Sequence, residues 1–226
     1  MKPQIRSGAT EPEKTSYSAR HSYGDYQIGV EYERRRFSGP LGRYRWRREQ
    51  AAVRKLVTAL PSGISILDCP CGTGRWWPAL SKRASEIYAV DLSPGMLEHA
   101  AARASDWQVP VHLLAGDAES LPLADNSVDY TFSFALMKHL PRPVQYRVLR
   151  EFARVSRFGV VCTFGVFGHV SYELWRRRSV AESYPMVIEE LRWMAAAAGL
   201  QVIRSVSCTT PVGVERLVHL APLSSD

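Results

Sequence analysis

A short segment that combines glycine with acidic residues is the part of this sequence best suited to hold a small ligand. Asp68 is followed by Gly72 and Gly74, and Asp91 ends the next predicted strand. Glycines let the backbone turn sharply and lie against a ligand, and the N-terminus of the helix that follows offers unpaired N–H groups to an anionic group. Because a carboxylate at the end of the next strand accepts hydrogen bonds from both hydroxyls of a ribose, Asp91 points to a ribose-containing ligand.

A dinucleotide-binding enzyme is one interpretation of such a turn, but the sequence departs from its fingerprint. The pattern Gly-x-Gly-x-x-Gly requires a third glycine at the position of Trp77, whose indole would block close approach of a pyrophosphate. Asp68, which precedes the turn, has no part in that fingerprint. We therefore rank an NAD-dependent oxidoreductase well behind the other interpretations.

The same residues resemble the class I S-adenosylmethionine-dependent methyltransferases. Asp-x-x-x-Gly-x-Gly at residues 68–74, followed by Asp91 at the next strand end, is that family's pattern. Gly116-Asp117-Ala118 is similar to its adenine-recognition turn, residues 121–129 to its approach to the fourth strand, and residues 134–140 to the stretch that lines its methyl-transfer site. The resemblance covers about residues 50–220, is nearest to the ubiquinone and menaquinone type of small-molecule methyltransferase, and implies S-adenosyl-L-methionine as cofactor.

The resemblance also implies a role for each matching residue on the donor side. Asp68 would orient the methionine amino group, partly through water, while Gly72 and Gly74 would give backbone contacts to the same moiety, and Asp91 would hold the ribose. The other implied cofactor-binding residues are Cys69 in the glycine loop, Leu92 and Met96 against the adenine, Asp117 and Ala118 at the adenine edge, and Phe134 near the sulfonium. Loop capping is the alternative for the two strand-end acids, and core packing is the alternative for Leu92 and Met96.

One histidine is a candidate catalytic residue. Methyl transfer from a sulfonium is an in-line displacement, so the enzyme mainly positions donor and acceptor and excludes water. A general base is needed only if the acceptor must lose a proton. His139, just after the fourth predicted strand, fits that role, with a loop-shaping or helix-capping histidine as the alternative. No Asp-Pro-Pro-Tyr or Asn-Pro-Pro-Tyr follows that strand, which argues against methylation of exocyclic amines on DNA bases.

Two additions to the core are expected to hold the acceptor: an N-terminal arm and an insert at about residues 165–185. The candidate substrate-binding residues are Tyr23, Tyr26 and Arg43 in the arm and His169, Tyr172 and Trp175 in the insert. Aromatic side chains beside arginines suggest a planar or anionic acceptor, so we expect a small-molecule or lipid-linked one. Two alternatives stay open: an RNA or protein methyltransferase that docks through the basic arm, and a catalytically silent fold that binds the donor or a partner.

The composition is that of a soluble protein in a reducing compartment. The 226 residues are 46 % hydrophobic and 23 % charged, with a net charge of +7. The first 14 residues hold no apolar stretch, so we expect no signal peptide, and no apolar run reaches the length of a membrane span. Four cysteines without neighbouring zinc ligands favour the cytoplasm and no metal site. The sequence defines neither the acceptor atom nor the oligomeric state.

The elements that must position these residues alternate between strand and helix. Hydrophobic spacing and turn residues predict helices at 48–60, 75–83, 93–104, 143–155 and 186–198, and strands at 64–67, 87–90, 111–114, 128–134, 160–164, 201–207 and 213–220. The last two strands have so short a link that they must be antiparallel. We therefore expect an α/β fold, a Rossmann-like doubly wound sheet of about seven strands, mostly parallel with one antiparallel strand near an edge. Residues 1–47 would be a flexible start and a helical basic arm or lid, and residues 48–226 the methyltransferase domain.

Overall fold

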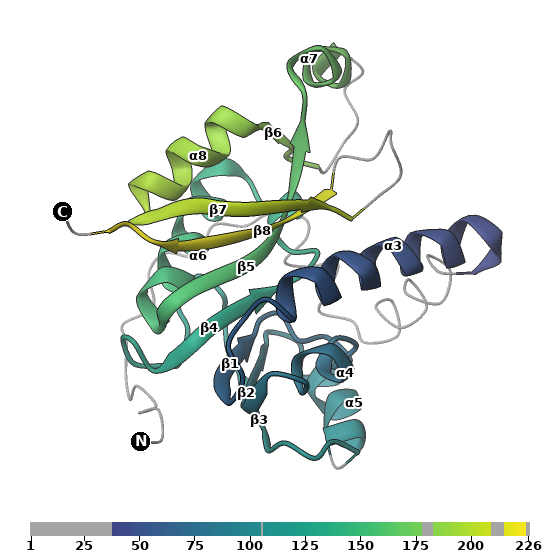
Figure 1. Ribbon diagram of the computed structural model, residues 1–226, viewed down its shortest axis with the longest axis vertical. Coiled ribbons are helices and arrows are strands. Elements are labelled where there is room, and N and C mark those ends of the chain that lie inside the picture. The colour runs from purple at the N-terminus through teal and green to yellow at the C-terminus, as the bar shows by residue number, and fades with distance from the viewer. Residues whose placement is uncertain (1–37, 105, 178–182, 209–214, 225–226) are drawn as a thin grey trace.

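The computed structural model of the protein describes residues 38–104, 106–177, 183–208 and 215–224 (Figure 1). The strands of this part are β1 (Ile64–Asp68), β2 (Ala84–Asp91), β3 (Val111–Ala115), β4 (Val128–Ser133), β5 (Ser156–Phe167), β6 (Met186–Val187), β7 (Leu200–Ser207) and β8 (Glu215–Pro222). The helices are α3 (Gly39–Val57), α4 (Trp77–Leu80), α5 (Pro94–Ala104), the 3-10 helix η1 (Met137–His139), α6 (Arg142–Val155), α7 (His169–Arg177) and α8 (Ile188–Ala197).

The described strands form one mixed sheet whose order places the glycine turn at its centre. Seven strands follow the order β3-β2-β1-β4-β5-β8-β7, and the two-residue β6 pairs with β5 beside that path. From β3 to β5 all pairings are parallel, whereas β8 runs antiparallel to both β5 and β7. This confirms the predicted Rossmann-like sheet with one reversed strand near an edge. The strand order changes direction at β1 and β4, and open α/β sheets bind ligands beyond the carboxyl ends at such a point.

Helices cover both faces of the sheet, and each face has its own core (Figure 1). On one face, side chains of α3, α4 and α5 pack against the sheet, including Leu56, Trp77 and Ala100. On the other face, α6 and α8 do so, with Phe152 and Leu191 fully buried. Because the centre of the sheet is covered on both faces, all five residues of β1 are buried, the polar Ser65 and Asp68 included.

Several element bounds differ from those predicted. Helix α3 begins at Gly39 rather than at residue 48, because Pro40 fits the first turn of a helix and the exposed, polar first turns show no hydrophobic period. Helix α4 has only four residues instead of the nine predicted at 75–83, since hydrogen-bonded turns occupy residues 71–76. Strands β2 and β5 are longer than predicted. The predictions missed α7, and they placed the two residues of β6 at the start of the last helix, predicted at 186–198.

The boundary drawn at residues 47 and 48 therefore falls inside α3. The candidate residues Tyr23 and Tyr26 lie outside the described residues. Within the part of the chain that the structure describes, no helix is both long and apolar enough to cross a membrane.

Candidate functional site

The first two strands of the motif end in buried carboxyl groups at the same edge of the sheet. Asp68 is the last residue of β1 and Asp91 the last residue of β2, and their side chains are only 1 % and 8 % exposed. The parallel register pairs Asp68 with Ala89, two residues before Asp91. Two carboxyl groups so close in a buried place need hydrogen-bond donors or a bound cation, because burial penalises the ionised form.

Asp91 holds the glycine turn against the end of β2. One of its carboxylate oxygens accepts a hydrogen bond from the Gly72 backbone N–H at 2.8 Å, and the other accepts one from the Ser93 N–H at 2.9 Å. Burial raises the pKa of Asp91, and these two N–H donors oppose the rise. A carboxylate keeps further lone pairs after two such bonds, so Asp91 retains acceptor capacity for ligand hydroxyls.

Asp68 is partnered by the indole of Trp77, a contact that the sequence pattern did not predict. Trp77 is fully buried, and its Nε1–H donates to the Asp68 carboxyl group at 3.0 Å. Burial raises the pKa of Asp68 to about 8, while the Trp77 hydrogen bond and the Arg75 charge oppose the rise. The sequence holds only a general indication of this contact. A buried Trp N–H needs a hydrogen-bond acceptor, and the carboxylate of Asp68 precedes the turn that leads to Trp77. Near neutral pH, Asp68 therefore favours a cationic ligand group that compensates its ionised form.

The two glycines of the turn have different surroundings. Both have left-handed backbone angles, with φ of +52° at Gly72 and +72° at Gly74. A Cβ at Gly74 would lie 2.6 Å from the Trp77 ring, so this glycine is required by internal packing. In the part of the chain that the structure describes, a Cβ at Gly72 would meet nothing within 4 Å. The open side of Gly72, next to the Asp91 carboxylate, leaves the backbone accessible to a ligand.

The ends of β3 and β4 complete this edge of the sheet. The Gly116 N–H donates to the Asp91 backbone carbonyl at 3.0 Å, and Asp117 and Ala118 follow directly in a half-exposed turn. Asp117 accepts a hydrogen bond from the Glu119 N–H at 3.0 Å. The structure thus brings the turn at Asp117 and Ala118 beside the end of β2.

Leu92 and Met96 face different surroundings. Leu92 is 48 % exposed, an unusual state for a leucine beside a buried acid, and it offers an apolar surface at the mouth of the site. Met96 is buried in α5. Leu92 is therefore the better placed of the two for contact with a ligand.

Phe134 follows β4 in a tightly held turn. It is buried, and Ala135 next to it adopts φ of +64°, a rare conformation for a residue with a Cβ. The Ala135 N–H donates to the Thr163 hydroxyl on β5 at 2.7 Å, which holds the turn in place. Such strained positions occur often at functional sites, where the surrounding structure fixes them.

Arg75 and three aromatic rings form a cluster that the sequence analysis did not identify. The guanidinium lies 4.9 Å from the Trp76 ring centroid and 5.5 Å from those of Trp46 and Phe134. The Trp76 and Phe134 rings are 4.6 Å apart, and Trp46 lies 5.2 Å from Trp76. The cluster connects α3 to the end of β4, so α3 is part of the wall of this edge.

The cysteines of the glycine loop are inert. Cys69 and Cys71 are free and buried, and burial raises the pKa of each thiol well above its ordinary value. The Cys69 side chain packs into the core under α6, so its contact with a ligand would be through its backbone. Within the described residues, no group of three His, Cys, Asp or Glu side chains is placed to hold a metal ion.

The candidate acceptor-side residues are not brought together. His139 is half-buried in η1, close after the Phe134 turn. His169 is 73 % exposed and pairs with Glu189 of α8 at 3.3 Å, while Tyr172 and Trp175 of α7 stack at 6.0 Å. Arg43 is exposed near the start of α3. Figure 1 shows α7 well apart from the first turns of α3, so these described residues do not line one pocket.

Comparison with known proteins agrees with this arrangement of the strand ends. Residues 66–159, which run from β1 into β5, match the family model described as "Methyltransferase domain". The chain contains a methyltransferase domain. It is 30 % identical over 184 residues to the biotin biosynthesis bifunctional protein BioHC of Cellvibrio japonicus, covering 76 % of this chain and 35 % of that protein. It is 38 % identical over 109 residues to a demethylmenaquinone methyltransferase of Bacillus licheniformis, covering 46 % of this chain and 45 % of that enzyme.

The fold of this methyltransferase domain is shared with a solved enzyme. The magnesium protoporphyrin IX methyltransferase of Synechocystis, solved with bound SAH, superposes with a TM-score of 0.73 at 14 % identity and covers 91 % of this chain and 98 % of its own. The predicted family and fold, and S-adenosylmethionine as the cofactor of such a domain, are thereby confirmed. The chain spans less than half the length of the two curated relatives, so their activities and substrates do not transfer directly to it.

Proposed function

We propose that this protein transfers a methyl group from S-adenosylmethionine to a small-molecule acceptor that is planar or anionic. The observation that carries the proposal is the pair of buried carboxyl groups at the ends of β1 and β2, one of which holds the open glycine turn by a hydrogen bond. The donor has a ribose diol, an ammonium group and a sulfonium. These are the groups that such carboxylates recognise.

On the donor side, each polar group of the cofactor meets a residue of matching chemistry. The ribose hydroxyls would donate to Asp91, and the methionine ammonium would compensate Asp68. The adenine would lie between Leu92 and the turn at Asp117, where the Ala118 backbone N–H is available to its edge. S-Adenosylmethionine supplies the electrophilic methyl group, and the chain supplies its orientation.

On the acceptor side, the protein's main task is to align a nucleophile with the methyl group and to exclude water. Phe134 lies at the end of β4, where the family places the sulfonium, and its aromatic face would stabilise positive charge there. His139 would accept a proton if the acceptor nucleophile must lose one. The acceptor contacts proposed on α7 are Tyr172 and Trp175, whose stacked rings favour a planar molecule.

The names of the relatives support a small acceptor. One similar protein is named for demethylmenaquinone and one for biotin biosynthesis, and a structural relative acts on magnesium protoporphyrin IX. These molecules differ in structure, so they support the class of acceptor rather than one compound.

Calorimetric titration of the purified protein with S-adenosylmethionine, and separately with NAD, tests the donor site. We expect saturable binding of S-adenosylmethionine and none of NAD. Replacement of Asp91 by Ala should weaken donor binding by about a hundredfold, because it removes a buried, charged hydrogen-bond acceptor. Asp106, an exposed residue, provides the matched control, and Asp106→Ala should bind as the wild type does.

Three outcomes would contradict the proposal. Binding of NAD alone would show that the glycine turn serves a dinucleotide. Binding of neither ligand by folded protein would favour a silent fold. Equal loss of binding in both aspartate variants would show that Asp91 has no specific role.

The acceptor class needs a separate experiment because α3 is strongly basic. Arg43, Arg47, Arg48, Arg54 and Lys55 are exposed on this helix, which favours an RNA or an acidic protein as the second candidate acceptor. Transfer of labelled methyl from the donor into fractions of a cell extract separates the classes. We expect label in the small-molecule and lipid fraction. Label in RNA, with binding that falls steeply as salt rises, would favour the second candidate.

A further inference from the structure

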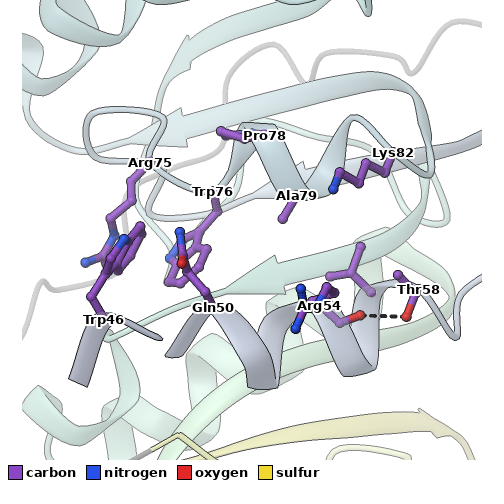
Figure 2. Close-up of a pocket in the computed structure, with 10 residues that line it drawn as sticks. Trp46, Gln50, Arg54, Thr58, Arg75, Trp76, Pro78, Ala79 and Lys82 are labelled. Atoms are coloured by element: carbon purple, nitrogen blue, oxygen red, sulfur yellow. Dashed lines mark hydrogen bonds between the residues drawn. The ribbon is translucent and has the colours of Figure 1, made fainter. Parts of the chain in front are cut away.

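A groove lies between α3 and the segment around α4, outside the donor site described above. Its volume is about 240 Å³, and its lining includes Trp46, Gln50, Arg54, Arg75, Trp76 and Lys82 (Figure 2). None of these residues belongs to the predicted cofactor site. Drug-sized ligands occupy pockets of roughly 300–1,000 Å³, so this groove suits a smaller molecule.

One end of the groove is aromatic. Trp46 of α3 and Trp76 before α4 lie 5.2 Å apart with an angle of 35° between their rings, and Arg75 lies against both. Trp46 is half-exposed, whereas Trp76 is buried and separates the groove from Phe134. A flat or apolar group would therefore contact this end without reaching the methyl-transfer centre.

The other end of the groove is cationic. Figure 2 shows the side chains of Arg54, from α3, and Lys82, after α4, reaching into the space between the two segments. Within the described residues, neither side chain takes part in a hydrogen bond or an ion pair. Two neighbouring cations do have partners. The Arg75 guanidinium lies 3.9 Å from the carboxylate of the buried Glu49, and the Arg83 guanidinium donates hydrogen bonds to the Ser62 hydroxyl and the Thr58 backbone carbonyl.

The charge balance of the groove favours an anion. Among the described residues, the lining holds three basic side chains and no acidic one, and of the three only Arg75 lies within ion-pair distance of an acid. Guanidinium and ammonium groups from two different segments converge on an anionic group most strongly when it has several acceptor oxygens, as a phosphate has. The Thr58 hydroxyl, which already donates to the Arg54 carbonyl, adds polar surface at this end.

We propose that this groove is a second ligand site that binds a small phosphate monoester of a flat or apolar group. The phosphate would lie between Arg54 and Lys82, and the flat group would lie on Trp46 and Trp76. This site does not depend on the identity of the methyl acceptor, and a ligand there contacts the aromatic cluster that borders the donor site.

Calorimetry with 1-naphthyl phosphate as the probe tests the proposal, in the presence of saturating S-adenosylhomocysteine to occupy the donor site. We expect saturable binding of one probe molecule per chain. The double variant Arg54→Gln/Lys82→Gln should weaken binding at least tenfold, since it removes two charge-assisted hydrogen bonds. 1-Naphthol, which lacks the phosphate, should bind no better to the wild type than the probe binds to that variant.

A second double variant controls for the loss of charge. Arg47→Gln/Lys55→Gln removes the same charge from exposed positions of α3 that do not line the groove, and we expect probe affinity within twofold of the wild type. Equal loss in both double variants would show general attraction to a basic surface and would overturn the proposal. So would the absence of probe binding by protein that still binds S-adenosylhomocysteine. Loss of S-adenosylhomocysteine binding itself would instead count against the proposed function.

Discussion

The proposed donor edge, where Asp68 and Asp91 end β1 and β2, differs from the region around α7 in how its candidate residues are held. At the donor edge, Asp68 and Asp91 are buried at the ends of adjacent strands, and each accepts a hydrogen bond from the segment 72–77. On α7, His169 is mostly exposed and is held by one surface ion pair. Surface pairs of this kind contribute about 0–1 kcal/mol, whereas removing a partner of a buried polar group costs about 1–3 kcal/mol.

The proposed donor site is therefore part of the folded core, whereas the proposed acceptor contacts on α7 lie at its surface. Changes at the donor edge should therefore affect both folding and binding. Changes on α7 should affect acceptor use alone.

The largest effect is expected from Gly74→Ala. The new Cβ would lie 2.6 Å from the Trp77 ring in a left-handed backbone conformation, so we expect destabilisation of about 2–4 kcal/mol. Gly72→Ala is the matched control: it has the same type of backbone angle but open space around it, and it should cost only about 1 kcal/mol. Urea unfolding of the two variants measures both values. Equal midpoints would show that Trp77 does not pack against the turn as described.

The second effect is a pH dependence of donor binding that comes from Asp68. Its pKa is raised to about 8 by burial, so the free protein holds a proton there at pH 6 that binding of the donor's ammonium must release. Donor affinity should rise by up to about tenfold per pH unit from pH 6 to pH 8 and level off above the pKa of Asp68. Calorimetry in buffers of different ionisation enthalpy counts the released protons.

The variant Asp68→Asn isolates this contribution from that of the donor's own amino group. It has no proton to release at this position, so its donor affinity should change less with pH than that of the wild type. The same pH dependence in both proteins would contradict the proposed contact between Asp68 and the ammonium group.

A smaller effect is expected from Thr163→Val. The substitution keeps the shape of the side chain but removes the acceptor for the Ala135 N–H, which should cost about 1–2 kcal/mol and loosen the turn that holds Phe134. Thr131→Val is the matched control, because Thr131 shares a buried hydrogen bond with Ser156 near the start of β5. We expect both variants to lose stability, but only Thr163→Val to lose donor affinity, by a few-fold. Equal donor affinity in the two variants would separate Phe134 from the donor site.

The smallest effect is expected from His169→Ala on α7. Loss of its exposed ion pair with Glu189 should change the free energy of unfolding by less than about 0.5 kcal/mol and leave donor affinity within twofold of the wild type. Thermal unfolding and donor titration check both expectations. A large loss of donor affinity would mean that α7 and the donor edge act as one unit.

The difference between the buried strand ends and the exposed α7 also explains which parts of the site the sequence could predict. Asp68, Gly72 and Asp91 lie where the pattern placed them, because carboxyl ends of parallel strands meet at one edge of a sheet. The Trp77 hydrogen bond was missed, since a sequence does not fix the direction of an indole N–H. Helix α7 was missed because it has only nine residues and no Ser, Thr, Asp or Asn stands immediately before it as a capping signal. The groove between α3 and α4 depends on residues far apart in the chain, which no local pattern brings together.

A crystal structure of the protein with bound S-adenosylhomocysteine would show whether the carboxyl groups at the ends of β1 and β2 hold the donor. We expect the ribose hydroxyls within hydrogen-bond distance of the Asp91 carboxylate, the amino group at Asp68 and the adenine beside the turn at Asp117. A ligand bound elsewhere, for example in the groove between α3 and α4, or one whose ribose does not contact Asp91, would contradict it.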